Sequence, residues 1–311
     1  MALTVDVIVP VYGNWALTRS CLEHLAAQSL AHRVIVVDDA SPDDTLAQLA
    51  AGFPSVDVLR LERNSGFAAA CNRGLAHATA DIVVLVNNDV EAEPSMLGKL
   101  IEPFDDASVG SVSPVLLRPD GLIDAFGITA DVTLSGFQRL HGASLDRVAE
   151  PQHRLLGPYG AVAAYRRIAL DQVGLLDEAI VMYGEELDLA LRLSAAGWVP
   201  AAAPDARGVH LGGATAGRGS AGQRERAGYG RGYLLRAWAI LHGRHAARAL
   251  LTEVIATAGD AMLSRDGAAA RGRRAGWKAG KAAGVRPRSV PDVDTRIGFL
   301  ESLRLRSGSR A

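Results

Sequence analysis

Three polar residues, Asn87, Asn88 and Asp89, end the apolar stretch that begins after Asp81. The stretch is rich in β-branched residues and has the length of a fully buried strand, so we expect a central strand of a parallel sheet. Ligands of open α/β sheets bind beyond the carboxyl ends of the strands, which places the three polar side chains at a ligand site. A carboxylate flanked by amide oxygens suits Mg²⁺ or Mn²⁺, ions that commonly carry phosphates with them. The alternative is an Asn/Asp turn that only ends the strand.

A second pair of acids, Asp38 and Asp39, ends the apolar stretch 33–37 in the same way. Both carboxylates are therefore expected at the same edge of the sheet. The alternative is acidity at the start of a helix, since Ser41 has the type of an N-cap residue and Pro42 that of a first helical residue.

A third group of acids, Glu185, Glu186 and Asp188, lies in a predicted helix over residues 182–193. The helix dipole favours acids in a first turn without any function, which is the alternative here. Crowded carboxylates also repel each other, which raises the pKa of one of them and suits a general base. Glu185 and Asp188 share a helix face, whereas Glu186 points about 100° away from Glu185.

The elements that must position these groups alternate along the chain. Strands are predicted at 5–10, 33–37, 56–61, 81–89 and 109–114, and helices at 15–28, 67–77 and 93–104. This alternation predicts βαβ units, a parallel sheet and right-handed crossovers. No G-x-G-x-x-G motif follows the first strand, which argues against a dehydrogenase. The prediction is an α/β fold with a nucleotide site built from carboxylates at strand ends.

Composition and length set the class of protein. A chain of 311 residues with 49% hydrophobic content can form one large domain and a smaller appendage. No apolar run approaches the ~20 residues of a transmembrane helix, and the first residues lack the basic region of a signal peptide. Cys21 and Cys71 have no metal-ligand spacing and are predicted as small buried residues, so we expect a cytoplasmic protein.

The charge is divided unevenly between the two ends of the chain. Residues 1–235 hold 18 Lys and Arg against 28 Asp and Glu, giving −10, whereas residues 236–311 hold 15 against 6, giving +9. We therefore predict a catalytic domain at 1–235 and a helical, basic extension at 236–311. The basic extension, with Trp277 among its charges, suits peripheral contact with the inner face of an anionic membrane. The alternative is an appendage that packs on the catalytic domain or on another subunit of a homo-oligomer; no nucleic-acid-binding module is recognised.

Residues 5 to about 215 resemble the inverting family-2 glycosyltransferases of the GT-A fold, in their bacterial rhamnosyltransferase-like branch. The matching motifs, in order, are Ile8-Val9-Pro10-Val11-Tyr12, Val36–Asp43, Asn64–Gly74 and Leu85–Asp89. The metal motif of this branch often reads Asn-Asn-Asp, which leaves Asp89 as the carboxylate ligand. The resemblance implies a UDP- or dTDP-sugar donor, a divalent cation (Mg²⁺ or Mn²⁺), and a glycan or lipid-linked acceptor.

The resemblance also implies roles for individual residues. Pro10, Val11 and Tyr12 would pack on the nucleoside, and Asp38 or Asp39 would accept a hydrogen bond from the N–H of a uracil or thymine ring. Near the ribose and the diphosphate, in addition to Asn87 and Asn88, it would place Asn64, Gly66, Asn72 and Arg73.

Further along, residues 157–167 resemble the strand of the family that passes beneath the sugar. The family's acid pair corresponds to Glu185-Glu186 in this chain, and the resemblance places the general base at Glu186. His210 would bind the metal through an imidazole nitrogen, and residues 212–230 are predicted to form a mobile loop over the donor. For a lone His, a structural role is the alternative.

Two other functions fit parts of the sequence. A binding protein of the same fold without turnover is suggested by Asn87 and Glu186, where the family usually has Asp. A sugar nucleotidyltransferase would also combine an α/β sheet with a metal, but it normally needs a Gly-rich loop where this chain has Pro10-Val11-Tyr12-Gly13. The favoured hypothesis is a metal-dependent glycosyltransferase that moves a hexose or deoxyhexose, such as rhamnose, to a sugar hydroxyl of a cell-surface glycan.

Overall fold

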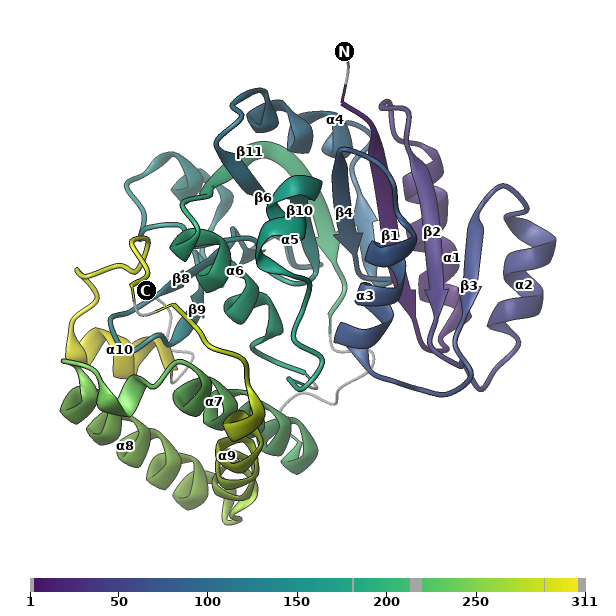
Figure 1. Cartoon of the computed structure of the whole chain (residues 1–311). Coiled ribbons are helices and arrows are strands. Elements are labelled where there is room, and N and C mark those ends of the chain that lie inside the picture. The colour runs from purple at the N-terminus through teal and green to yellow at the C-terminus, as the bar shows by residue number, and fades with distance from the viewer. Residues whose placement is uncertain (1–2, 181, 213–219, 288, 307–311) are drawn as a thin grey trace.

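A computed structural model describes residues 3–180, 182–212, 220–287 and 289–306. Within them, one mixed sheet has the strand order β3-β2-β1-β4-β10-β6-β11-β5, with β7 paired to β6 (Figure 1). Its strands are β1 (Val5–Val11), β2 (Arg33–Asp38), β3 (Asp57–Arg60), β4 (Ile82–Val86), β5 (Val90–Ala92), β6 (Val109–Leu117), β7 (Ile123–Ala125), β10 (Val162–Arg166) and β11 (Val199–His210). A separate hairpin pairs β8 (Ile128–Ala130) with β9 (Gly136–Gln138).

The prediction of a central buried strand is confirmed by β4. All five of its residues are buried, and it pairs in parallel with β1 on one side and antiparallel with β10 on the other. The four strands β1 to β4 are parallel to one another in the order β3-β2-β1-β4. Their carboxyl ends therefore meet at one edge of the sheet, as the sequence predicts.

Two layers of helices cover the sheet (Figure 1). On one face α1 (Trp15–Ala26), α2 (Thr45–Gly52) and α4 (Met96–Ile101) share a core with Val7 and Val84. On the other, α3 (Phe67–His77), α5 (Arg167–Val173) and α6 (Glu185–Ala195) share a core with Ile8 and Leu85. The side chains of successive strand residues thus point into opposite cores, as expected for a pleated strand. Cys21 and Cys71 are both buried, as predicted.

Two helix predictions need correction. The helix predicted to begin at Ser41 begins at Thr45, because Asp43 accepts hydrogen bonds from both the backbone N–H and the hydroxyl of Thr45 and so forms a turn first. The single helix predicted over 93–104 is divided into α4 and the 3₁₀ helix η1 (Glu102–Asp105), with Pro103 at the division.

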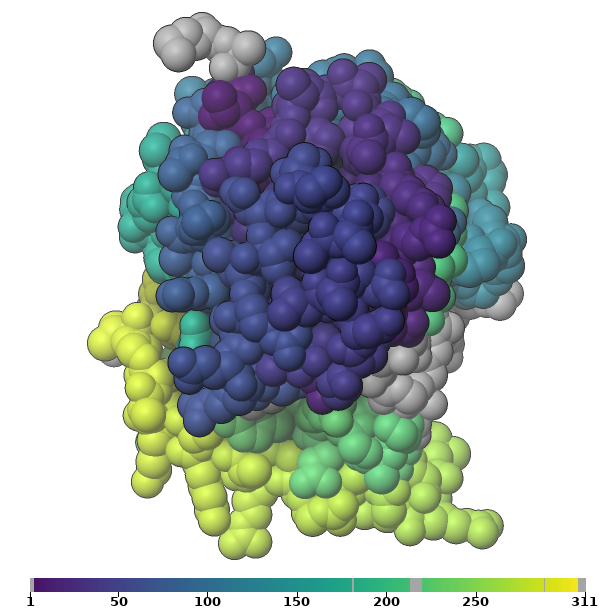
Figure 2. All heavy atoms as spheres, turned by 90° about the vertical axis from the view of Figure 1, so that its right-hand side faces the viewer, coloured from purple at the N-terminus to yellow at the C-terminus, as the bar shows by residue number. Residues whose placement is uncertain are grey.

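The C-terminal part is helical, as predicted, with α7 (Ala221–Ala237), α8 (Ala246–Ser264), α9 (Ala268–Ala279) and α10 (Phe299–Arg306). These helices lie together on one side of the sheet domain, below it in both whole-molecule views (Figures 1 and 2). The predicted boundary after residue 235 falls inside α7 and stays a prediction. In the described part of the chain, no helix combines the length and the apolar character needed to cross a membrane.

The mobile loop predicted over 212–230 is wrong from Ala221 onward, where α7 begins; residues 213–219 lie outside the described residues. The glycines of this stretch serve close helix packing instead. A Cβ on Gly228 or Gly232 would lie within 2.4 Å of a carbonyl oxygen of α9, and one on Gly272 or Gly276 within 2.0 Å of a carbonyl oxygen of α7. The two helices therefore pack backbone against backbone, which outweighs the low helix propensity of glycine.

Candidate functional site

A cavity of about 770 Å³ lies at the carboxyl ends of β1 and β4. It brings together twelve of the sixteen residues proposed from the sequence, which are Pro10, Val11, Tyr12, Asp39, Asn64, Gly66, Asn87, Asn88, Asp89, Glu185, Glu186 and His210. The other four, which do not line it, are Asp38, Asn72, Arg73 and Asp188. Groups that are more than 120 residues apart in sequence, such as Asp89 and His210, thus meet in one space because both follow strands that end at this edge.

Asp89 and His210 face each other in this cavity. His210 Nε2 lies 3.4 Å from Asp89 Oδ1, and both side chains are largely buried. Asp89 lies directly before β5, which pairs antiparallel with β11, the strand that ends at His210. The N–H of Leu211 also donates to the backbone carbonyl of Asp89. This register fixes their separation.

His210 is held from its other side by Asp124, which the sequence analysis missed. His210 Nδ1 lies 2.7 Å from Asp124 Oδ2. A carboxylate only accepts hydrogen bonds, so Nδ1 must carry the proton and Nε2 is directed at Asp89. Burial would lower the pKa of His210, but the hydrogen bonds and negative charges of Asp124 and Asp89 outweigh it and raise that pKa to about 9.

Asp124 lies in the three-residue strand β7, inside a segment without clear periodicity. Its backbone carbonyl also lies 2.7 Å from Nδ1 of His141. The only signal in the sequence is an acid between apolar neighbours in Leu122-Ile123-Asp124-Ala125-Phe126, which is a weak indication of a buried functional acid.

The pair Asp89 and His210 fits a divalent cation on its chemistry. A neutral imidazole whose Nδ1–H is held by a carboxylate is the usual form of a histidine ligand. His210, whose raised pKa favours the protonated ring, would lose its Nε2 proton to solvent when a cation binds. No cluster of three or more His, Cys, Asp or Glu that could hold a metal occurs among the described residues. Asp89 and His210 would be two ligands, and a bound diphosphate and water could fill the remaining positions, as phosphates and waters do at Mg²⁺ sites.

On the nucleoside side, the two acids after β2 have separate roles. Asp39 lines the cavity, and its two oxygens accept hydrogen bonds from the N–H groups of Ser65 (2.7 Å) and Gly66 (2.9 Å). Asp38 is fully buried, pairs with the guanidinium of Arg60 and accepts from the N–H of Ser41. Of the two acids, the geometry leaves only Asp39 in reach of a ligand in the cavity.

Asn72 and Arg73 also lie elsewhere. The side chain of Asn72 exchanges two hydrogen bonds with the backbone of Leu176, at 2.9 and 3.0 Å, and so ties α3 to the loop that precedes α6. Arg73 is exposed on the outer surface of α3.

Two of the three acids of α6 line the cavity and the third does not. Glu185 and Glu186 line the cavity, and burial raises the pKa of both carboxyl groups. Glu185 is only 5% exposed, and within the described residues its Oε2 has no hydrogen-bond partner. Glu186 Oε2 accepts a hydrogen bond of 3.2 Å from the N–H of Gly184. The turn before them is strained, because Tyr183 has a φ of 69°.

Asp188 points away from the cavity into the protein. It is fully buried and accepts hydrogen bonds from Arg192 Nε (2.8 Å), Trp238 Nε1 (2.9 Å) and Arg286 Nε (2.9 Å). Its carboxylate is thus saturated by partners, two of them from the C-terminal extension. Asp188, which the sequence grouped with the acids that suit a general base, thus joins the two parts of the chain and does not line the cavity.

Comparisons with known proteins identify the family of the chain. Residues 6–174 match the model of glycosyl transferase family 2. An N-acetylglucosaminyl-diphospho-decaprenol L-rhamnosyltransferase of Mycobacterium tuberculosis is 29% identical over 214 residues, which cover 60% of this chain and 70% of that protein. A protein of the same organism described as putative glycosyltransferases is 39% identical over 102 residues, 30% of this chain and 29% of that one, so the chain spans less than a third of that relative.

Solved structures support the fold. A mannosyltransferase from Pyrobaculum calidifontis in complex with GDP-Man and Mn²⁺ has a TM-score of 0.57 at 21% identity, covering 99% of this chain and 84% of that one. The structure of GalNAc-T7 with UDP, GalNAc and Mn²⁺ also has a TM-score of 0.57, at 16% identity and covering 76% and 50% of the two chains. The mostly parallel sheet with its flanking helices is the GT-A fold, and the chain belongs to glycosyl transferase family 2.

Proposed function

We propose that this glycosyltransferase is metal-dependent and inverting, and that it moves a hexose or deoxyhexose, such as rhamnose, from a UDP- or dTDP-sugar to a sugar hydroxyl of a lipid-linked or cell-surface glycan. One observation carries the proposal. The pair Asp89 and His210, which suits a cation, and the carboxylates of Glu185 and Glu186, whose pKa values burial raises, line the same cavity.

The nucleotide would lie along the loops that follow β1 and β2. Tyr12 is 43% exposed and offers its ring to a base, and Asp39 lines the same region. Each oxygen of Asp39 accepts one backbone hydrogen bond and keeps a second lone pair, so it can still accept the ring N–H of uracil or thymine. Asn64 and Gly66 would lie against the ribose, since Asp39 holds their loop in place.

Asp89 and His210 would hold the cation on the donor diphosphate. A cation there neutralises negative charge as the nucleoside diphosphate leaves. The chain's own contribution is orientation, because Asp124 fixes the imidazole of His210 and the pairing of β11 with β5 fixes the distance to Asp89. Asp124 is thus a positioning residue.

Glu186 is the proposed general base. It lines the donor cavity and also a smaller cavity of about 220 Å³ beside it. A group at this junction can receive an acceptor hydroxyl from one side and face the donor sugar from the other. Removal of the hydroxyl proton by Glu186 and a single displacement at the anomeric carbon would invert that centre.

Two observations support a lipid-linked acceptor. The relative from M. tuberculosis carries N-acetylglucosaminyl-diphospho-decaprenol in its name. In this chain the outer face of α8 exposes Leu250, Leu251 and Val254 by 55, 51 and 57%, in a C-terminal segment of charge +9. An apolar helix face in a basic setting suits the surface of an anionic bilayer, so we propose peripheral membrane contact through α8.

Donor turnover without acceptor tests the proposed function. The protein is incubated with UDP- and dTDP-sugars and Mn²⁺, and the products are separated by chromatography. Slow release of UDP or dTDP from one donor is expected of a transferase. In a parallel incubation with added pyrophosphate, formation of UTP or dTTP and a sugar 1-phosphate would indicate a nucleotidyltransferase. Binding of the donor without any product would indicate a binding protein. Either outcome contradicts the proposal.

A further inference from the structure

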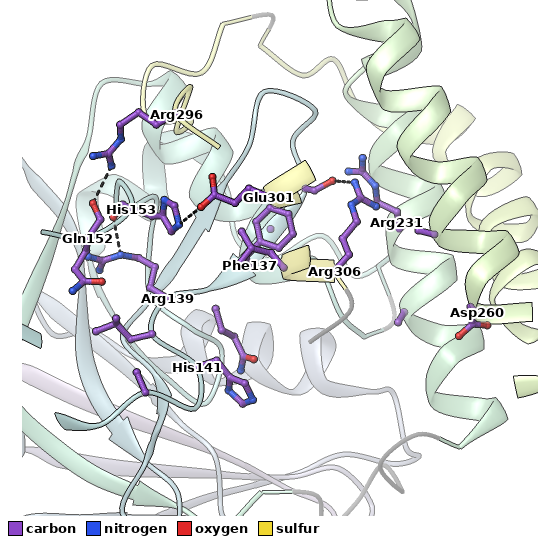
Figure 3. Close-up of a pocket in the computed structure, with 18 of the residues that line it drawn as sticks. Phe137, Arg139, His141, Gln152, His153, Arg231, Asp260, Arg296, Glu301 and Arg306 are labelled. Carbon is purple, nitrogen blue, oxygen red and sulfur yellow. Dashed lines mark hydrogen bonds and ion pairs between the residues drawn. The ribbon is translucent and has the colours of Figure 1, made fainter. Parts of the chain in front are cut away.

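A second cavity, of about 920 Å³, lies between the catalytic sheet domain and the C-terminal helices (Figure 3). We call it the arginine cavity, because its lining includes the seven arginines Arg139, Arg147, Arg224, Arg231, Arg273, Arg296 and Arg306. The two acids that line it, Asp260 and Glu301, already lie against Arg224 (3.5 Å) and His153 (3.2 Å). Arg147 and Arg296 pair with Glu150 and Asp294. The remaining four arginines, Arg139, Arg231, Arg273 and Arg306, therefore set the charge of its inner wall.

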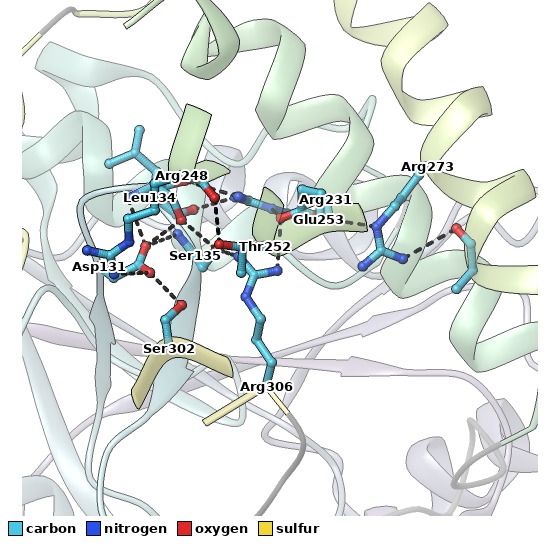
Figure 4. Close-up of polar contacts among 12 residues, drawn as sticks. Asp131, Leu134, Ser135, Arg231, Arg248, Thr252, Glu253, Arg273, Ser302 and Arg306 are labelled. Atoms are coloured by element: carbon cyan, nitrogen blue, oxygen red, sulfur yellow. Dashed lines mark hydrogen bonds and ion pairs between the residues drawn. The ribbon is translucent and has the colours of Figure 1, made fainter. Parts of the chain in front are cut away.

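Three of these four share a single carboxylate (Figure 4). Arg231, Arg273 and Arg306 come from α7, α9 and α10, and their nitrogens lie 2.8, 3.1 and 2.8 Å from the two oxygens of Glu253. Burial would raise the pKa of Glu253, but the three guanidinium groups outweigh it and lower that pKa to about 2. This part of the wall thus carries an excess of positive charge that Glu253 cannot neutralise.

Arg139 is the fourth. It is only 7% exposed, donates to the carbonyls of His153 (2.9 Å) and Phe126 (2.8 Å), and has no carboxylate partner among the described residues. Burial lowers its pKa to about 10, as expected for a guanidinium taken from water without a counterion. Arg306 adds an Nε that is buried and finds no acceptor within the described part of the chain. An anion in the cavity would supply the counterion that Arg139 lacks.

The smaller cavity already described adjoins both the donor cavity and the arginine cavity, because it shares lining residues with each. Glu186, Tyr159 and Tyr183 line both the donor cavity and the small one. Arg231 and Phe137 line both the small one and the arginine cavity, and Gln138 lines all three. A ligand in the small cavity can therefore have Glu186 at one end and Arg231 at the other.

We propose that the arginine cavity binds the phosphate or diphosphate group of the acceptor, with the acceptor sugar lying in the small cavity beside Glu186. The inference rests on the proposed function, because it assigns the acceptor to this side of Glu186. Guanidinium groups suit the task, since their planar N–H donors bind phosphate oxygens in pairs and stay charged when buried. A phosphorylated lipid headgroup and a free phosphorylated glycan share this chemistry.

Binding of inorganic pyrophosphate, measured by calorimetry in EDTA, tests the cavity without any turnover. EDTA removes the cation through which the donor cavity would hold the same anion. Arg273→Gln is the test variant, because Glu253 keeps two of its three partners and the fold should survive, as a thermal melt would verify. Arg274→Gln is the matched control, since Arg274 lies next in α9, is exposed and does not line the cavity.

Arg273→Gln is expected to weaken pyrophosphate binding about ten-fold, the usual loss for a charge-assisted hydrogen bond, whereas Arg274→Gln binds like the parent. Arg306→Gln serves as a second test variant with the same expectation. Equal affinity in all three variants and the parent, or no binding by the parent, would overturn the proposal.

Kinetics then separate the sources of the phosphate. For a polyprenyl-diphosphate-linked sugar, Arg273→Gln should raise KM about ten-fold and leave the KM for the donor unchanged. The same increase in KM for a short, soluble diphosphate-linked sugar would identify the phosphate itself as the recognised group. An increase seen only with the long lipid would show that the protein recognises the lipid, and it would refute the phosphate site. Donor turnover without acceptor reports on the proposed function alone, so its failure is distinguishable from a failure of the arginine cavity.

Discussion

Replacement of Glu186 by Gln isolates the proposed base. The amide keeps the size of the side chain and can still accept the hydrogen bond that Gly184 N–H donates to Glu186 Oε2, so the turn before α6 should persist. What is lost is basicity. General bases contribute about 10²–10⁴ in rate, or about 3–5 kcal/mol of transition-state stabilisation. We therefore expect kcat to fall by that factor with donor affinity unchanged, because the proposed base would contact the acceptor and not the nucleotide.

Glu185→Gln is the matched control. It removes the same charge one residue earlier from a side chain that lines the same cavity, and we expect less than a ten-fold loss in kcat. The assay is initial-rate kinetics with saturating donor, together with a thermal melt of each variant. Parental turnover in Glu186→Gln with a dead Glu185→Gln would show that the base is Glu185.

The pH dependence gives an independent reading of the same residue. Burial raises the pKa of Glu186, and a base acts only when it is deprotonated. The kcat/KM of the parent should therefore fall as the pH drops through this raised pKa. In Glu186→Gln that limb should vanish, and its persistence would assign it to another group.

Three further predictions concern other parts of the chain. Asp124→Asn should weaken Mn²⁺ affinity about 10–100-fold, because it removes the carboxylate that orients His210, and calorimetry in the presence of UDP measures the loss; unchanged affinity would exclude the positioning role. Leu251→Glu combined with Val254→Glu should reduce sedimentation with anionic liposomes, whereas Ile168→Glu, at an exposed position of α5, should not. Equal sedimentation of the double variant and the parent would refute the membrane proposal. Gly276→Ala should destabilise the fold by about 1–3 kcal/mol, since its Cβ would lie 1.9 Å from the Tyr229 carbonyl oxygen. Gly259→Ala in α8 has open space and should stabilise by up to about 1 kcal/mol in denaturant titrations; a stable Gly276→Ala would refute the close packing of α7 and α9.

Strong local patterns made the sheet domain predictable. The apolar run of β4 and the helix α3, predicted at 67–77 and observed at Phe67–His77, depend on residues that are close in sequence. The positions of Asp89 and Asp39 followed from the rule that ligands bind at the carboxyl ends of parallel strands. Local periodicity and one topological rule were thus sufficient for this half of the site.

Residues whose partners lie far away in sequence were not predictable. Helical spacing grouped Asp188 with Glu185, but it could not reveal that Trp238 and Arg286 lie opposite Asp188. Asp124 was missed because a three-residue strand has no usable periodicity. The glycines of α7 indicated a loop, and only the contact with α9 explains why they lie in a helix.

The sequence left two interpretations of the charged extension open, contact with a membrane and packing on the catalytic domain or on another subunit. In the first, its basic residues face the membrane. In the structure Arg273 and Arg306 turn toward Glu253 and the arginine cavity instead. A count of charges cannot separate arginines that face solvent from arginines that line a cavity.

Stabilisation by nucleotide and metal tests the central claim most directly. The thermal melting temperature is measured for the parent, Asp89→Ala and the exposed-acid control Asp205→Ala, each with Mn²⁺, with UDP or dTDP, and with both. A ligand at one hundred times its Kd stabilises a protein by about 2.7 kcal/mol, which is a shift of several degrees. The parent and Asp205→Ala should show this shift only when metal and nucleotide are both present, and Asp89→Ala should show none. An equal shift in Asp89→Ala would place the cation elsewhere and contradict the proposed site.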